Sequence, residues 1–304
     1  MEPRFKDRFL TALLRVLPQH ALSALMYRAA RVTWRPFKNL LIREVVNRYA
    51  VDMFEAANPR PESYPSFNAF FTRALKPDAR PIAAEADAVA CPADGKINQA
   101  GYIEEGRLLQ AKGHPFSLLQ LLAGREDLAD TFSGGGYATI YLSPRDYHRV
   151  HMPLTGRLRE MIFVPGSLFS VSEATTHLVP GLFARNERVI CLFDTEAGPM
   201  AVILVGAIFV GSMETVWAGE VRGPAGEPTT WLYTGNRPYV LKKGEEMGRF
   251  NMGSTVITLF GRDRVAWDPA LVPGVRVRMG QRIGRIMLPP EERRAPRPDA
   301  SPPV

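Results

Sequence analysis

The spacing of the hydrophobic residues predicts helices over the first fifty positions. In residues 5–17 the apolar side chains occupy about half of a helical wheel and the arginines lie opposite them, which is typical of an amphipathic helix. The segments 21–34 and 37–49 repeat the mixture of Leu, Met, aromatic residues and Arg, and Pro18 and Pro36 separate the three segments. We therefore expect a helical arm before the rest of the chain.

The hydrophobic pattern changes after the arm. Residues 52–81 read as a helix and then a loop, with an apolar helical face again at 66–71, and from about Ala88 short apolar runs alternate with Gly, Pro and Asp. That alternation predicts a β-rich domain of many short strands. Two strand–glycine–strand segments, 244–250 and 280–286, echo each other at an offset of 36 residues. The predicted fold class is α+β, with a barrel-like or sandwich-like domain that contains an internal pseudo-repeat.

These changes divide the chain into three parts. Residues 1–50 form the arm, residues 51–288 form the β-rich domain, and residues 289–304 form a proline-rich tail that we expect to be disordered.

Charge singles out the arm. The net charge is +7, and residues 1–50 hold ten Lys and Arg against three acids, whereas the other 254 residues balance. A basic arm is attracted to nucleic acid or to anionic lipid. Phe, Leu and Trp beside the arginines favour a membrane surface, and the alternative is an ordinary surface helix packed on its own domain.

No segment is expected to span a bilayer. The longest apolar run, 200–211, has 12 residues, short of the roughly 20 that a crossing needs. The N-terminus does not resemble a signal peptide, and the two cysteines indicate a reducing compartment. We expect a peripheral protein on the cytoplasmic side of the inner membrane, with no nucleic-acid partner.

Candidate chemistry begins with two histidines in the segment YLSPRDYHRVHMP. Ser143 and Pro144 predict the start of a short helical turn that leads to His148 and His151. The pair could bind a metal, but a third ligand is not obvious, and we expect none. The alternative is that one histidine acts as a general base and the other serves a second step.

Asp94 and Ser254 are the other candidates. Asp94 lies in an Asp-Gly pair, which is common in turns. Gly253, Ser254 and Thr255 interrupt an apolar strand, either as a bulge or turn or because chemistry needs an exposed serine. Taken alone, each fits an ordinary structural role.

Together these residues resemble the phosphatidylserine decarboxylase family, of the pyruvoyl-dependent, bacterial membrane-associated type. The similarity runs from about Phe54 to Met287. It is carried by the motifs PADG, YLSPRDYHRVHMP, VPGSLFSVS, RNER, VGAIFVGS and KGEEMGRFNMGST. The family usually has Leu-Gly-Ser-Thr where this chain has Met252 before Gly253, and that apolar residue does not react.

The resemblance implies a chain that cuts itself between Gly253 and Ser254. The Ser254 hydroxyl attacks the Gly253 carbonyl to give an ester, and β-elimination then frees the Gly253 carboxylate and leaves dehydroalanine. Loss of ammonia leaves a pyruvoyl group at position 254. The products are a β chain, 1–253, and an α chain, 254–304.

Roles for the candidates follow from the same resemblance. Asp94, His151 and Ser254 form the charge relay for cleavage, in which His151 takes the serine proton and Asp94 orients His151. The pyruvoyl group forms a Schiff base with the substrate amine, and His148 serves the decarboxylation step. Phe169 and Ser170 are candidates for the substrate site, with core packing as the alternative for Phe169.

The implied activity converts phosphatidylserine in an anionic membrane to phosphatidylethanolamine and CO2, within phospholipid biosynthesis. A homodimer of the paired α and β chains fits the family. Arg185 and Arg188 either contact phosphate or carboxylate or form an ion-pair loop. Competing hypotheses are a serine acyl hydrolase, a membrane-attached scaffold, and a relative that decarboxylates another amino acid.

Overall fold

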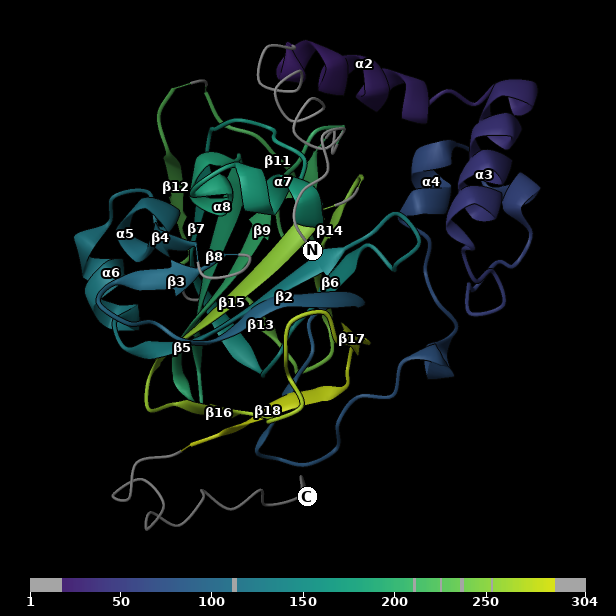
Figure 1. The fold of residues 1–304 in the computed structure, drawn as a ribbon. Helices are drawn as coiled ribbons and strands as arrows, with labels where there is room; N and C mark the ends of the chain where they lie inside the picture. The colour runs from purple at the N-terminus through teal and green to yellow at the C-terminus, as the bar shows by residue number, and fades with distance from the viewer. Residues whose placement is uncertain are drawn as a thin grey trace.

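Helices open the described part of the chain and strands make up most of the remainder (Figure 1). The computed structural model describes residues 18–287, except 111–113, 210–211, 225, 236–237 and 253. The predicted helix over 5–17, the tail 289–304 and Gly253 therefore lie outside the described residues. The helices are α2 (Gln19–Ala30), α3 (Arg35–Tyr49), η1 (Pro61–Ser63), α4 (Phe67–Phe71), η2 (Pro77–Ala79), α5 (Leu118–Leu121), α6 (Glu126–Phe132), α7 (Glu173–Leu178) and α8 (Leu182–Arg185).

Both helices expected after residue 18 are present. Pro36 lies in the first turn of α3, where its missing N–H costs nothing, and Ala50 ends that helix in a left-handed conformation. Ser66 caps α4 by accepting a hydrogen bond from the Ala69 N–H at 3.2 Å. The helix expected from residue 52 is wrong. There the Asp52 carboxylate accepts from the Phe54 N–H at 2.8 Å, a local bond that competes with helix formation.

The strands confirm the expected β-rich domain. They are β1 (Ala88–Ala90), β2 (Gly95–Tyr102), β3 (Arg107–Leu109), β4 (Pro115–Ser117), β5 (Gly135–Leu142), β6 (Arg149–His151), β7 (Gly156–Val164), β8 (Arg188–Thr195), β9 (Gly198–Val205), β10 (Met213–Thr215), β11 (Gly219–Val221), β12 (Thr229–Leu232), β13 (Val240–Leu241), β14 (Glu246–Phe250), β15 (Ser254–Arg262), β16 (Val265–Trp267), β17 (Arg276–Val277) and β18 (Arg282–Ile286).

These strands form open sheets. The largest has the order β12-β7-β8-β9-β15-β5-β2-β17, with β13 paired to β7, and a second has the order β11-β10-β14-β6. A third has the order β1-β18-β16, and β3 pairs with β4. Among the described strands no sheet closes into a barrel, so of the two expected shapes the open, layered one holds. The α+β class is confirmed.

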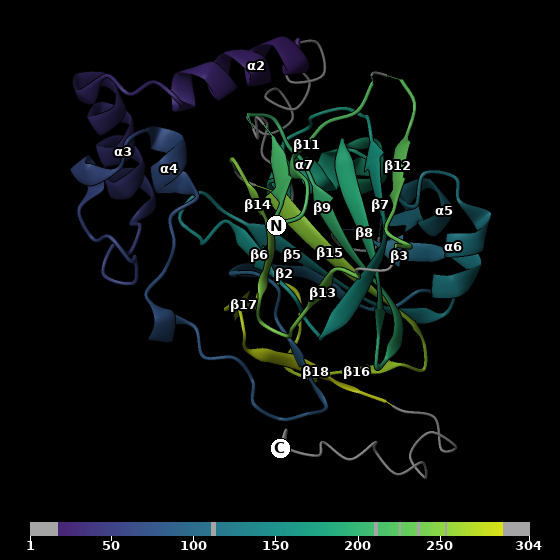
Figure 2. The same cartoon turned by 180° about the vertical axis from the view of Figure 1, so that it is seen from behind.

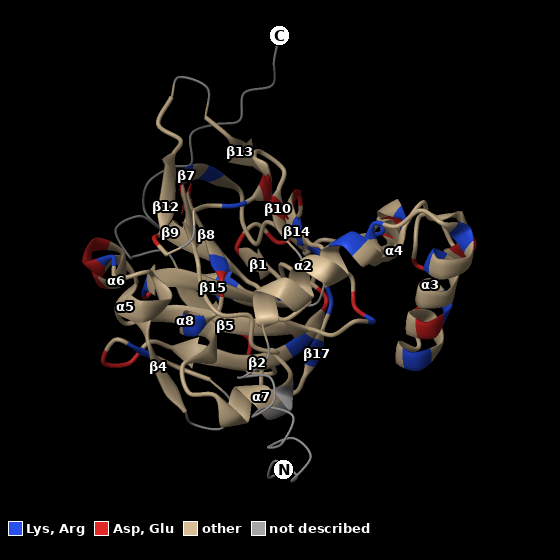
Figure 3. Cartoon of the chain, turned by 90° about the horizontal axis from the view of Figure 1, so that it is seen from above, with Lys and Arg blue, Asp and Glu red and all other residues tan. Residues whose placement is uncertain are grey.

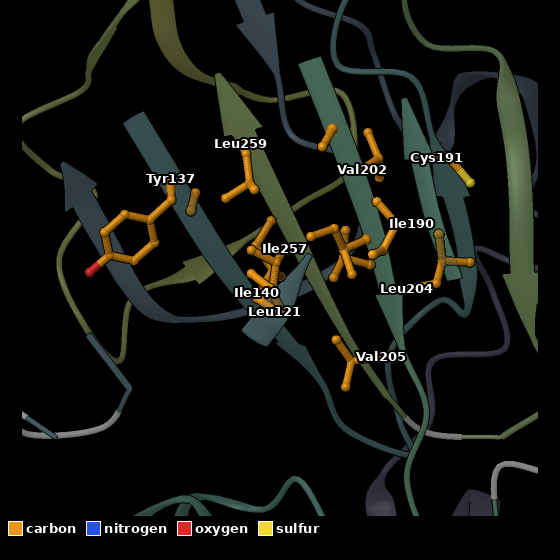
Figure 4. Close-up of a cluster of buried hydrophobic side chains, with 14 of the residues drawn as sticks. Leu121, Tyr137, Ile140, Ile190, Cys191, Val202, Leu204, Val205, Ile257 and Leu259 are labelled. Atoms are coloured by element: carbon orange, nitrogen blue, oxygen red, sulfur yellow. The ribbon is translucent and has the colours of Figure 1, made fainter. Parts of the chain in front are cut away.

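Strand β15 lies at the centre of the largest sheet, between β9 and β5. Its residues 254–261 are all buried, because other parts of the chain cover both faces of the sheet at this point. Figure 4 shows Ile257 and Leu259 of β15 among side chains from the neighbouring strands, including Ile140, Ile190 and Val202. Burial on both faces explains why the sequence shows a continuous apolar run here rather than an alternating pattern.

The pseudo-repeat is visible as two matching turns. Gly244 and Gly280 have φ of +84° and +82°, a conformation that side chains disfavour. Their N–H groups donate to the carbonyls of Met152 and Cys91, each at 2.9 Å. A Cβ on either glycine would come within 2.8 Å of the Ile82 side chain. The repeated sequence segment therefore corresponds to the same glycine turn formed twice, both times against Ile82.

A second, smaller hydrophobic cluster lies between α3 and α4, beside the β-rich body (Figure 2). Ile42 of α3 and Phe67, Phe70 and Phe71 of α4 are buried in it, and Met252 packs against it. Two residues later, β15 begins inside the main core. The segment that leads into β15 thus joins the two hydrophobic clusters.

Arg188 has neither of its expected roles. Its side chain is 2% exposed, and its guanidinium donates to the carbonyls of Gln120, Leu121, Ala184 and Asn186 at 2.6–2.9 Å. All four acceptors are backbone carbonyls rather than carboxylates. Arg188 therefore holds α5 and α8 against the start of β8. Burial lowers the pKa of this guanidinium to about 10.

Arg188→Ala is expected to lower the free energy of unfolding by about 3 kcal/mol or more, because it leaves several buried carbonyls without a donor. Denaturant unfolding measures this loss. The matched control is Arg285→Ala, which removes an exposed ion pair to Asp87 (3.0 Å) and is expected to cost less than about 1 kcal/mol. Equal losses in the two variants would contradict the structural role of Arg188.

Candidate active site

Ser254 is the first residue of β15 and is 0% exposed. It pairs across the sheet with Leu142, the last residue of β5. Within the described part of the chain, its buried Oγ has no hydrogen-bond partner. The expectation of an exposed serine in a turn is therefore wrong, because the strand register places it inside the sheet. A buried hydroxyl left unpaired costs about 1–3 kcal/mol, which makes it a candidate for chemistry.

His148 is bound to the two segments that lead to this serine across the sheet and along the chain. Its Nε2 donates to the carbonyl of Ser143 at 3.1 Å, and Ser143 directly follows Leu142, the partner of Ser254. The backbone carbonyl of His148 accepts from the Phe250 N–H at 3.0 Å, at the other end of the segment that leads to Ser254. Because a carbonyl only accepts, the proton lies on Nε2, and Nδ1 of the neutral ring is a proton acceptor.

The His148 ring is held neutral by its surroundings. It is 0% exposed and stacks on Phe71 with ring centroids 4.1 Å apart. Burial and the neighbouring Arg73 guanidinium lower its pKa to about 3. Its Nδ1 is buried and has no hydrogen-bond partner among the described residues. The site thus combines an unpaired hydroxyl with an unpaired basic nitrogen.

This neutral histidine predicts acid sensitivity. In the unfolded chain the imidazole takes up a proton below its ordinary pKa of 6.5, whereas in the folded chain it does so only near pH 3. The unfolded state therefore binds more protons in this window, and stability is lost as the pH falls through it. Between pH 7 and pH 5, denaturant unfolding should show a loss of about 2 kcal/mol from His148. His148→Gln should remove that part of the slope, and an unchanged slope would contradict the assignment.

His151 lies at the far end of β6, about 10 Å along the chain from His148. His151 donates from Nδ1 to the Gly244 carbonyl at 2.9 Å and accepts at Nε2 from the Tyr147 hydroxyl at 3.1 Å. Burial lowers its pKa, so this ring too is mainly neutral.

Asp94 has other partners. It accepts two bonds from Arg80 Nε and Nη2 and a third from the Met279 N–H at 2.8 Å. The predicted relay of Asp94, His151 and Ser254 is therefore not joined by direct hydrogen bonds in this structure. The backbone still ties His151 to the segment that contains Asp94, since the His151 N–H donates to the carbonyl of Pro92 at 2.8 Å.

The two pseudo-repeat turns hold these residues in place. The first turn supplies the Gly244 carbonyl to His151, and the second supplies the Met279 N–H to Asp94. The sequence predicted the repeated turn and named both residues, but it did not predict that the two turns bind the two residues.

The helical turn expected from Ser143 is absent. The N–H and Oγ of Ser143 both donate to the Asp146 carboxylate, at 2.8 and 2.6 Å. Arg276 also binds Asp146, and together these contacts make a tight turn instead of a helix. The turn still delivers His148 to the start of β6.

A cavity of about 500 Å³ opens beside Asp94 and Tyr147. Sequence reasoning missed three residues around it: Tyr147, which binds His151, Arg80, which binds Asp94, and Arg73, which lies beside His148. Only Tyr147 had a signal, since it directly precedes His148 in the quoted motif. Arg73 and Arg80 come from a distant part of the chain, and only folding brings them here.

Phe169 is largely buried, and its backbone binds the Asn186 side chain through two hydrogen bonds at 2.9 and 3.1 Å. Its ring also lines a hollow against the start of α2, and Arg185 lies over it at 5.0 Å. Ser170 Oγ accepts from the Ser172 N–H at 3.3 Å. Core packing, the alternative considered for Phe169, is therefore present, and its part in a substrate site stays a prediction. Among the described residues, no three His, Cys, Asp or Glu side chains are grouped as a metal site.

Comparison with known proteins decides the family. A family model described as phosphatidylserine decarboxylase matches residues 67–285, and one described as PSD matches residues 9–50. The chain belongs to the phosphatidylserine decarboxylase family. The first match covers all the candidate residues that the structure places at β6, β14 and β15.

Three relatives illustrate the similarity, each named phosphatidylserine decarboxylase proenzyme. One from Pseudomonas aeruginosa (strain LESB58) is 57% identical over 281 residues, which cover 91% of this chain and 96% of the relative. One from Azotobacter vinelandii is 55% identical over 287 residues, 93% and 100% of the two chains. One from Nitrosococcus oceani is 52% identical over 290 residues, 94% of each. The predicted family and decarboxylase class are confirmed, and the relatives' names support a precursor form.

Proposed function

We propose that this chain decarboxylates phosphatidylserine to phosphatidylethanolamine and CO2, using a pyruvoyl group made from its own Ser254. One observation carries the proposal: in a member of this family, the buried Ser254 hydroxyl is unpaired, and so is the buried Nδ1 of His148, whose ring binds the residue after the strand partner of Ser254. A purely structural buried serine would normally find a hydrogen-bond partner.

The residues present fit the formation of a pyruvoyl group. Ser254 supplies the hydroxyl that attacks the Gly253 carbonyl carbon, so that the peptide C–N bond breaks and a C–O ester bond forms. Elimination across Cα–Cβ of residue 254 then releases the Gly253 carboxylate, and hydrolysis releases ammonia. Once formed, the group supplies a carbonyl that takes up the electrons left when CO2 departs.

We assign proton transfers to two places. His151, supported by Tyr147 and Asp94, transfers the proton in self-cleavage, and His148 transfers the proton in decarboxylation. The support for His148 is position, since it binds Ser143 and Phe250, which lie close to residue 254 across the sheet and along the chain, and its buried Nδ1 is a proton acceptor. The support for His151 is its hydrogen bonding, since its Nε2 accepts a hydrogen bond from the Tyr147 hydroxyl and is therefore the basic nitrogen of the ring. The Arg80 guanidinium forms a buried ion pair with Asp94 beside this setting.

A membrane surface fits the helical arm. Among the described residues, no helix has both the length and the apolar character to cross a bilayer. Leu25 and Trp34 are 64% and 67% exposed, and Leu40 of α3 is exposed as well. Figure 3 shows Lys and Arg on the same helices. We propose that this arm binds the anionic inner leaflet from the cytoplasmic side, and that paired α and β chains assemble as a homodimer.

Mass spectrometry of the purified protein tests the proposal. The expected result is two chains, 1–253 and 254–304, with pyruvoyl in place of Ser254, in a protein that releases CO2 from phosphatidylserine vesicles. A single uncut chain that is fully active would overturn it. Labelling of Ser254 by a fluorophosphonate in an uncut chain would instead support the serine hydrolase hypothesis.

A further inference from the structure

Helix α2 contacts three segments of the β-rich domain. Gln19 accepts from the Leu168 N–H at 2.8 Å, beside the segment that contains Phe169. Ser23 accepts from the Phe209 N–H at 3.1 Å. Phe209 has φ of +69°, a strained conformation for an aromatic residue, so a fixed partner for its N–H matters. A cavity of about 280 Å³ lies between α2 and these segments.

The third contact is an ion pair between α2 and β11. The Tyr27 hydroxyl donates to both carboxylate oxygens of Glu220, at 3.0 and 3.1 Å. Arg31 donates to the same carboxylate at 2.7 Å and stacks over the Tyr27 ring at 3.5 Å. Partial burial raises the pKa of Glu220, but the hydrogen bonds from Tyr27 and Arg222 and the charge of Arg31 outweigh it and lower the pKa. Arg222 donates to the same carboxylate at 2.8 Å, so Glu220 is held by α2 on one side and by its own segment on the other.

From Glu220 a chain of side-chain hydrogen bonds leads to the cleavage segment. Ser212 Oγ donates to Glu220 at 3.1 Å, and Asn251 Nδ2 donates to Ser212 Oγ at 2.5 Å. Asn251 is 2% exposed and precedes Ser254 by three residues. Its amide also binds Glu214 at 2.7 Å and receives a bond from Asn68 of α4 at 3.0 Å. The side chain of Asn251 is thus fixed from several directions.

We propose that Asn251 is the positioning residue for self-cleavage, and that α2 acts on it through Glu220 and Ser212. The proposal rests on the proposed function, because it concerns the same Gly253–Ser254 bond. Attack of a hydroxyl on a neighbouring carbonyl depends steeply on geometry, and a misplacement of about 1 Å costs about a hundredfold in rate. Seating of α2 on the β-rich domain therefore sets how fast the precursor matures.

A double-mutant cycle tests the connection. The full-length chain is made by cell-free translation, and conversion of the 304-residue precursor to its two products is followed over time on a denaturing gel. Tyr27→Phe removes one hydroxyl at the α2 end. It is expected to slow cleavage about three- to tenfold, in line with the loss of one hydrogen bond to a charged group. Tyr102→Phe, which removes a hydroxyl bound to the Val265 carbonyl elsewhere, should leave the rate unchanged.

The second background is Ser212→Ala, which removes the link between Glu220 and Asn251. There, Tyr27→Phe should change the rate less than twofold, because the connection is already broken. If Ser212→Ala abolishes cleavage, Glu220→Gln takes its place in the cycle with the same expectation. A wild-type rate in Tyr27→Phe, or an equal slowing in both backgrounds, would overturn the proposal. Failure of the wild-type chain to cleave would instead overturn the proposed function.

Discussion

Ser254→Ala leaves the chain as one uncut 304-residue polypeptide without decarboxylase activity. The substitution removes the only atom that can attack the Gly253 carbonyl in the proposed reaction, and alanine cannot become a pyruvoyl group. We expect the loss of activity to exceed about 10⁴-fold, because neither cleavage nor the electron sink remains. Intact-mass measurement and CO2 release from phosphatidylserine vesicles check the two parts separately.

The same substitution should hardly affect folding. The Ser254 hydroxyl has no partner among the described residues, so its removal breaks no hydrogen bond there and relieves a buried polar atom. Thr258→Ala is the matched control, since Thr258 is buried in the same strand. Its hydroxyl donates to the Ala138 carbonyl at 3.4 Å, four residues away from Ser254 along the strand. That variant should still cleave. Full activity in an uncut Ser254→Ala chain would refute the mechanism.

Substitution of the two histidines should separate the two reactions. His151→Ala is expected to remain uncut, because the acceptor for the serine proton is lost with its hydrogen bonds to Tyr147 and Gly244. His148→Ala is expected to cleave, at a reduced rate, and to yield a protein with a pyruvoyl group and at least a hundredfold less decarboxylation. Gel electrophoresis reports cleavage, and CO2 release per mole of pyruvoyl reports decarboxylation.

The opposite pattern is equally informative. An uncut His148→Ala chain with a cleaved His151→Ala chain would make His148 the base of self-cleavage, as its position beside Ser254 also permits. His148→Gln distinguishes a lost proton acceptor from a lost side chain, since glutamine retains a donor for the Ser143 carbonyl. The same activity in His148→Gln as in the wild type would exclude proton transfer by His148.

Local pattern in the sequence determined the helices and strands, and its motifs carried the resemblance that named the candidate site residues. Apolar spacing gave α2, α3 and β15, because helix and strand periods depend on neighbouring positions. The 36-residue echo predicted the repeated glycine turn, since both copies need a residue that tolerates positive φ. The resemblance, through its motifs, supplied Asp94, His148, His151 and Ser254, and the comparisons confirmed the family.

Only the tertiary structure decided how those residues lie relative to one another. Ser254 is buried rather than exposed because the register of β15 on β5 places it against Leu142, a contact between residues more than a hundred positions apart. His148 binds Ser143, the residue after Leu142, while His151 lies at the other end of β6 and binds Gly244. The partners of Asp94 and Asn251 come from distant segments as well. Such contacts depend on strand pairing and packing across the fold, which the spacing of residues along one segment does not encode.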